Sequence, residues 1–81
     1  MFKVGDKVRV KENLKDILEK IEADGEYIIE TYEMADMFAG QIGVVTRVDD
    51  NDTYVVFDYY WKEYSLEYVA SNSISGYELL L

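Results

Sequence analysis

The stretch from residue 40 to residue 58 constrains the fold most, because two β-branched runs flank a short acidic segment there. The runs are Ile42 to Val48 and Thr53 to Tyr59, and the segment between them is Asp49-Asp-Asn-Asp52. Asp and Asn accept local backbone hydrogen bonds and tolerate left-handed conformations, so this arrangement predicts a β-hairpin. Apolar residues also alternate from Phe2 to Lys11, which predicts a first strand. The chain therefore favours a small, strongly bent β-barrel.

A helix is predicted between the first strand and the hairpin, over about residues 13–24. Asn13 stands where an N-cap belongs, and Gly25 suits a left-handed cap at the other end. The apolar residues between them recur at the spacing of one helix face, namely Leu14, Ile17, Leu18 and Ile21. We expect this face to cover an open end of the barrel, and a partner-binding or dimerising face is the alternative.

The remaining segments complete the predicted architecture. Thr31 can cap a short second helix that runs through Met34 and Phe38. Residues 61–64 can add a further strand, Ser65 can cap a helical turn over residues 66–70, and residues 74–81 are expected to close the barrel against the first strand. In a chain of 81 residues the simplest closed form is an SH3-like barrel. The predicted fold is thus mainly β, one SH3-like domain over residues 1–81 with a helical insertion between strands one and two.

Composition excludes most catalytic chemistry. Cysteine and histidine are both absent, which removes disulfides, thiolate or imidazole metal sites and Ser-His-Asp catalysis. Paired carboxylates such as Asp58 and Glu63 are expected by chance among 17 acidic residues, so no enzyme and no cofactor are predicted. The longest apolar run, Tyr54 to Phe57, is far shorter than the roughly 20 residues of a membrane span. Without a signal-like N-terminus, a cytoplasmic protein is expected.

The net charge of −9 is concentrated in the middle of the chain. Residues 21–58 hold one basic residue, Arg47, and ten acidic residues. Because phosphate binding needs Lys and Arg, direct contact with nucleic acid is disfavoured and a basic protein surface is the better match. The alternative is a solvated surface that keeps a small protein in solution. The candidate partner-binding carboxylates are Glu22, Asp24, Glu26, Glu30, Glu33, Asp36, Asp49, Asp50, Asp52 and Asp58.

An aromatic cluster is the second candidate surface, made of Tyr59, Tyr60, Trp61, Tyr64 and Tyr68. Neighbouring residues of a strand point to opposite faces, so some of these rings must reach the surface, where they would serve as interface anchors. In the alternative interpretation Trp61 fills the barrel and the tyrosines only line its rim.

Two further charged groups are candidate binding sites. The side-chain oxygens of Asp49, Asp50, Asn51 and Asp52 could hold Ca²⁺, but a four-residue segment cannot wrap six or more ligands around an ion, so no metal site is predicted. A basic strip is the only surface that could touch nucleic acid, and its cations are expected to pair with nearby carboxylates. It consists of Lys3, Lys7, Arg9 and Lys11.

Several segments also carry a family resemblance. They are the Phe-Lys-Val-Gly-Asp-Lys-Val-Arg-Val start, Glu33-Met34 with Phe38-Ala-Gly40, then Ile-Gly-Val-Val, Tyr-Val-Val-Phe-Asp and Trp61. In this order they resemble small phage and prophage SH3-like proteins. The start, the Val-Val-Phe-Asp strand and Tyr77-Glu-Leu also resemble the wider SH3-like superfamily, including domains of some ubiquitin ligases. The helical segment 14–24 departs from the compact loop expected there.

The phage resemblance implies an inhibitor of host defence in the host cytoplasm, of the anti-CRISPR or anti-restriction kind. Such a protein would act as a DNA mimic that occupies the basic nucleic-acid channel of a CRISPR effector or another nucleic-acid-processing protein. The alternative is an SH3-like adaptor or structural module that binds a peptide or self-associates through its aromatic surface. A chromatin-like or RNA-associated barrel is disfavoured by the charge. The sequence leaves the oligomeric state open.

Overall fold

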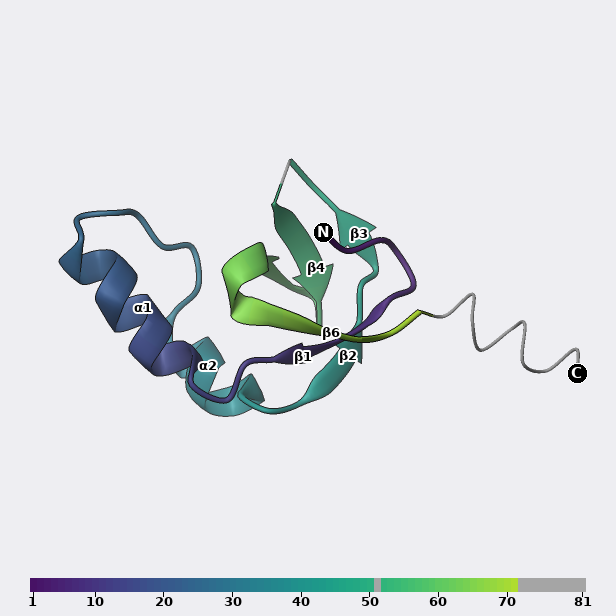
Figure 1. The fold of residues 1–81 in the computed structure, drawn as a ribbon, viewed down its shortest axis with the longest axis horizontal. Helices are drawn as coiled ribbons and strands as arrows, with labels where there is room; N and C mark the ends of the chain where they lie inside the picture. Colours follow the sequence, from purple (N-terminus) through teal and green to yellow (C-terminus); the bar gives the residue numbers. More distant parts are fainter. Residues whose placement is uncertain (51, 72–81) are drawn as a thin grey trace, which may run out of the picture.

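Two three-stranded antiparallel sheets and two α-helices make up the fold in the computed structural model, which describes residues 1–50 and 52–71 (Figure 1). The β1 sheet has the order β2-β1-β6, from β1 (Lys7–Val10), β2 (Ile42–Val44) and β6 (Leu66–Ala70). The β4 sheet has the order β3-β4-β5, from β3 (Arg47–Val48), β4 (Thr53–Val56) and β5 (Tyr59–Lys62). The helices α1 (Leu14–Ala23) and α2 (Tyr32–Phe38) lie between β1 and β2, and the 3-10 turn η1 (Glu63–Ser65) joins β5 to β6.

The chain passes from one sheet to the other at Val45 and Thr46. The amide of Val45 donates to the carbonyl of Asp6 at 2.9 Å, and the next amide, Thr46, donates to Val55 in the β4 sheet at 2.9 Å. Val45 is fully buried. One continuous β-branched run therefore supplies an edge strand to each sheet.

Gly43 of β2 lies opposite the buried Val8 and close to side chains that follow from the β4 sheet. A Cβ atom at this position would lie 2.7 Å from Cγ1 of Val56 and 2.7 Å from Cζ of Phe57. A side chain at position 43 would therefore force Val56 and Phe57 to shift.

The β4–β5 hairpin turns through Phe57 and Asp58, whose φ angles are 55° and 64°. A two-residue hairpin loop of the primed type needs positive φ at both positions, where glycine or asparagine is usual. Phe57 compensates by stacking its ring on Phe38 of α2, with centroids 4.7 Å apart and 9° between the planes. The ring of Trp61 meets Phe38 edge-on at 5.9 Å.

One continuous core joins the sheets and the helices. Trp61 is fully buried at its centre, and its indole N–H donates to the carbonyl of Val56 at 2.9 Å. The sheets contribute Val8, Val10, Val45, Tyr54, Val56, Trp61 and Leu66, and the helices contribute Leu14, Leu18, Met34 and Ala35. Among the described residues, no helix has the length and apolar character to cross a membrane.

The predicted strands and the first helix agree with the structure in type and order. Of the alternating N-terminal pattern only Lys7–Val10 forms a strand, β1, whereas the runs around residues 49–52 form β2 to β4 and α1 occupies residues 14–23 between β1 and β2. Thr31 caps α2 as expected, because its hydroxyl accepts a hydrogen bond from the amide of Met34 at 3.0 Å.

Three predictions were wrong. The described strands form two separate sheets and not a closed barrel. Residues 66–70 form β6, which pairs antiparallel with β1, and not a helical turn. The fifth strand runs from Tyr59 to Lys62, because the chain already turns at Phe57 and Asp58. The predicted closing strand over residues 74–81 lies outside the described residues.

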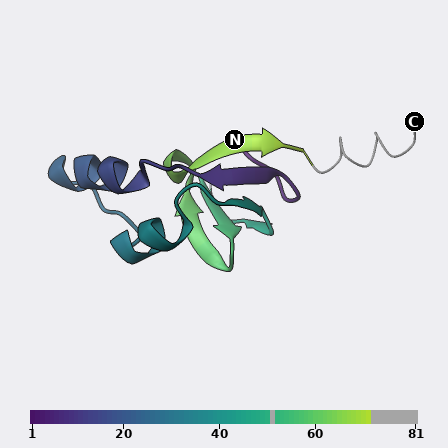
Figure 2. The same ribbon diagram turned by 90° about the horizontal axis from the view of Figure 1, so that it is seen from below.

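The apolar face of α1 also differs from its predicted role. Leu14 and Leu18 are buried in the core that the helices share with both sheets, but α1 also packs against α2, and the sheets form no closed barrel whose end it could cover. Figures 1 and 2 show both helices together at the same end of the molecule, beside the sheets.

Candidate functional site

The helical arm, defined as residues 12–36, carries most of the exposed charge. Two exposed lysines, Lys15 and Lys20, oppose eight exposed carboxylates in this segment. These are Glu12, Asp16, Glu19, Glu22, Asp24, Glu26, Glu33 and Asp36. The arm is therefore a strongly acidic surface built on two packed helices.

Local sequence signals explain how the arm turns back on itself. Gly25, at φ 84°, donates its amide to the carbonyl of Glu22 at 2.9 Å and ends α1. The following Tyr27 is 86% exposed, and Thr31 then caps α2. The connection therefore presents Tyr27 at the surface between the two helices.

Glu30 anchors this connection to the β4 sheet. Its carboxylate is buried and accepts hydrogen bonds from the amide of Lys62 at 2.8 Å, the phenol of Tyr64 at 2.9 Å and the hydroxyl of Ser65 at 2.5 Å. Burial, together with the neighbouring Glu30 carboxylate, raises the pKa of the Tyr64 phenol. Glu30 was expected to contact a partner, but its position makes it a structural residue that holds the arm in place.

Two side-chain contacts stiffen the arm internally. The phenol of Tyr32 donates to the Glu22 carboxylate, and this hydrogen bond raises the pKa of Tyr32 to about 12. Lys15 Nζ lies 3.2 Å from the Asp36 carboxylate. The carboxylates of the arm that enter no ion pair or hydrogen bond with a described residue include Asp24, Glu26 and Glu33.

The other predicted carboxylates lie elsewhere. Asp49 pairs with Arg47 at 2.9 Å, and Asp52 pairs with Lys62 at 3.2 Å. Asp58 is in the β4–β5 turn, at the opposite end of β4 from the β3–β4 connection that holds Asp50. The ten predicted residues therefore do not form one surface, because they divide among the arm, the two ends of β4 and the buried Glu30.

The predicted aromatic residues also separate. Trp61 is fully buried, and Tyr64 is held by Glu30. Tyr59 contacts Phe38, with ring centroids 5.4 Å apart, whereas the exposed Tyr60 accepts a hydrogen bond from the Arg47 guanidinium at 3.2 Å. The exposed Tyr68 lies in the other sheet, on β6. The five rings thus do not line one groove.

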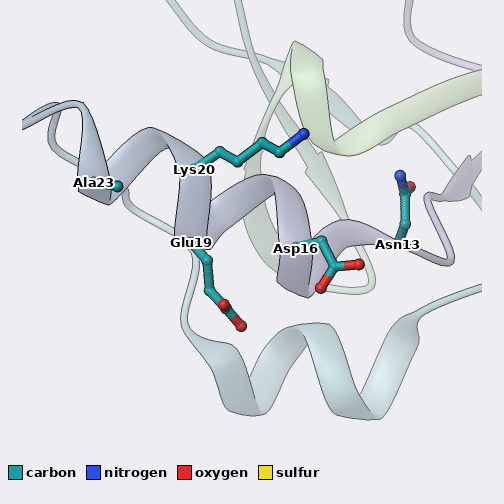
Figure 3. Close-up of a pocket in the computed structure, with 5 residues that line it drawn as sticks. All are labelled: Asn13, Asp16, Glu19, Lys20 and Ala23. Carbon is teal, nitrogen blue, oxygen red and sulfur yellow. The ribbon is translucent and has the colours of Figure 1, made fainter.

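The charged side chains that line the hollow along α1 do not converge on one binding site. It is open, has a volume of about 410 Å³ and is lined by Asn13, Asp16, Glu19, Lys20 and Ala23. Figure 3 shows Asp16 and Glu19 on one side of α1 and Lys20 on another, so their charged ends do not meet.

Among the described residues, one cation of the basic strip has a carboxylate partner as expected, and the other three do not. Arg9 Nη1 lies 3.4 Å from Glu67, but Lys3, Lys7 and Lys11 form no ion pair with any described residue. In residues 1–50 and 52–71 no three carboxylates gather closely enough to hold a metal ion.

Comparison with protein-family models, with curated proteins and with solved structures gave no match.

Proposed function

We propose that the protein is a non-catalytic inhibitor whose helical arm occupies a basic nucleic-acid-binding site on another protein. The observation that carries this proposal is the excess of eight exposed carboxylates over two lysines on residues 12–36. Arginines and lysines that bind phosphates also bind carboxylates, so the arm would compete with a polyanion for them.

The way in which the arm is attached to the sheets supports this proposal. Glu30 fixes the connection to the β4 sheet through three hydrogen bonds, and Tyr32 bridges to Glu22 across the arm. A surface that is already ordered loses less conformational freedom on binding, and its charge speeds association with a basic site.

We further propose a CRISPR effector or a restriction complex as the partner. The choice of these partners rests on the resemblance to phage SH3-like proteins. The element order gives it some support, since a long connection separates β1 from two hairpins, a 3-10 turn follows, and a last strand returns to β1. In this proposal the two sheets are an open relative of the SH3-like barrel.

Pull-down against purified CRISPR effector and restriction complexes across a salt series tests the proposal. The arm variant Glu19→Lys/Asp24→Lys/Glu26→Lys should weaken binding by about 100-fold, or about 2.7 kcal/mol. The variant Asp49→Lys/Asp50→Lys/Asp52→Lys reverses as many charges outside the arm and should bind nearly as well as wild type. Binding that ignores ionic strength, or equal losses in both variants, would contradict the role of the arm.

The adaptor function is a second candidate, which the half-exposed side chains of Tyr60 and Tyr68 favour. These rings lie on different sheets, so one peptide would have to span both. Replacing both by alanine should abolish binding if the adaptor function holds and leave the charge-driven binding intact otherwise.

A further inference from the structure

The outer face of the β1 sheet gathers cations on an otherwise acidic molecule. Val8 and Val10 are fully buried, so the alternation of β1 turns Lys7 and Arg9 to the outer face, and Lys11 follows the end of the strand. Lys7 and Lys11 enter no ion pair with the described part of the chain.

Exposed aliphatic side chains lie among these cations. In the register of β1 and β2, Val44 lies opposite Lys7 and Ile42 lies opposite Arg9. Directly opposite residues of an antiparallel pair share one face, and these two side chains are 43% and 50% exposed. Lys7, Arg9, Lys11, Ile42 and Val44 therefore form a mixed cationic and apolar surface, which we call the basic face.

One carboxylate, from the neighbouring strand β6, shares this face and is already paired. Glu67 of β6 lies opposite Arg9 and pairs with it, and both side chains remain about 40% exposed. Because that pair is exposed, it contributes little, and Arg9 stays available to a second anion.

We propose that the basic face binds the helical arm of a second copy of this chain. The arm offers eight exposed carboxylates, and the face offers three cations beside apolar side chains. In one molecule the two surfaces do not face each other, because the arm lies beyond one end of the sheets (Figures 1 and 2).

The contact is heterologous, since each copy uses a different surface. Such a contact can repeat, so it produces chains or small rings and not a two-fold dimer. Repulsion between copies of net charge −9 opposes growth, but at physiological ionic strength it is screened over about 8 Å, whereas the charges in direct contact are screened less. Small oligomers that dissociate at high salt are therefore expected.

Sedimentation velocity on the full chain, from roughly 5 to 500 µM, tests this proposal. Wild type should associate as its concentration rises, and about 1 M salt should reverse this. The face variant Lys7→Glu/Lys11→Glu and the arm variant Asp24→Lys/Glu26→Lys should each stay monomeric. An equimolar mixture of the face and arm variants should contain dimers, at twice the 9.5 kDa of one chain. The unaltered arm of the face variant can bind the unaltered face of the arm variant, whereas the two altered surfaces provide no second contact.

The control variant Asp50→Lys/Asp52→Lys lies outside both surfaces and should associate like wild type. A monomeric wild type, association of either single-surface variant, or loss of association in the control would overturn the proposal. A wild type that stays monomeric but binds DNA through Lys7 and Lys11 in a gel shift would also overturn it.

Circular dichroism identifies variants that fail to fold. In that case the concentration and salt dependence of wild-type association tests the proposal without them. The methyl resonances of Ile42 and Val44 should shift with concentration in nuclear magnetic resonance spectra, and unchanged resonances would count against the proposal. Neither measurement involves a host protein, so self-association can fail while the proposed function stands, and the reverse also holds.

Discussion

The side chain of Glu30 illustrates how one residue can determine the placement of a whole segment. A buried carboxylate is costly unless hydrogen bonds satisfy it, and here three donors do so without a cation. All three donors come from residues 62–65, more than 30 positions along the chain. The contact therefore ties the helical arm to β5 and η1.

Replacing Glu30 by alanine should cost about 3 kcal/mol of unfolding free energy, roughly 1 kcal/mol for each donor left without an acceptor. Urea unfolding followed by circular dichroism measures this loss. The exposed Glu33→Gln serves as the control and should stay within about 0.5 kcal/mol of wild type. A loss below about 1 kcal/mol for Glu30→Ala would show that water replaces the carboxylate and that the anchor is weak.

Tyr32 should titrate late because it donates to the Glu22 carboxylate, which raises its pKa from 10.0 to about 12. Its folded pKa exceeds its unfolded pKa, so this contribution to stability is complete below pH 10 and is lost as the pH rises through about 12. Ultraviolet titration of the phenols checks this. Glu22→Gln should return Tyr32 toward its ordinary value, and Tyr32→Phe should remove one late phenol. An unchanged titration curve in both variants would contradict the contact.

Gly43→Ala should destabilise the protein by about 1–3 kcal/mol, because the added methyl would overlap Val56 and Phe57 and force the sheets apart. Gly25→Ala is the matched control, since that position has open space but a φ of 84°. It should lose only about 1 kcal/mol, from backbone strain. Denaturant unfolding compares the two, and an equal loss would mean that overlap at Gly43 is relieved by small shifts.

The N-terminal caps of the two helices differ in a way that can be measured. Thr31 makes a side-chain bond to the amide of Met34, whereas Asn13 makes no such bond at the start of α1. Thr31→Ala should therefore cost about 1 kcal/mol, and Asn13→Ala only a few tenths of a kcal/mol. Thermal unfolding of both variants tests this pair. A larger loss at Asn13 than at Thr31 would contradict the capping geometry.

The sequence predicted elements whose signal is local and periodic. The spacing of Leu14 and Leu18 predicted the bounds of α1 nearly to the residue, and the alternation of apolar and polar residues predicted the strand β1. The prediction for residues 66–70 was wrong. Ser65 is a typical helix-capping residue, but pairing with β1, and not local propensity, makes that segment a strand.

The candidate site was predictable in charge but not in geometry. That residues 22–36 are acidic is a property of composition. The burial of Glu30 depends on donors far along the chain, and no local pattern distinguishes it from Glu26 or Glu33. The carboxylates outside the arm are also separated in space, because Asp50 precedes β4 and Asp58 follows it.

For the whole molecule, the separation of charge predicts how salt affects stability. Repulsion among the carboxylates of the arm opposes folding, whereas the five ion pairs of the described residues are exposed or partly exposed and contribute little. Raising the salt from low concentration to about 0.5 M should therefore raise the melting temperature by roughly 2–5 °C. Calorimetry at low protein concentration measures this. A fall in melting temperature would mean that the ion pairs outweigh the repulsion.

The ring stack between Phe38 and Phe57 has a consequence for cooperativity. Residues other than glycine at positive φ cost about 1 kcal/mol or more each, so the β4–β5 turn depends on the ring of α2 that lies against it. Helix α2 in turn has seven residues, too few to be stable alone. Neither piece can open without weakening the other, and their amide protons should exchange with solvent as a single foldon.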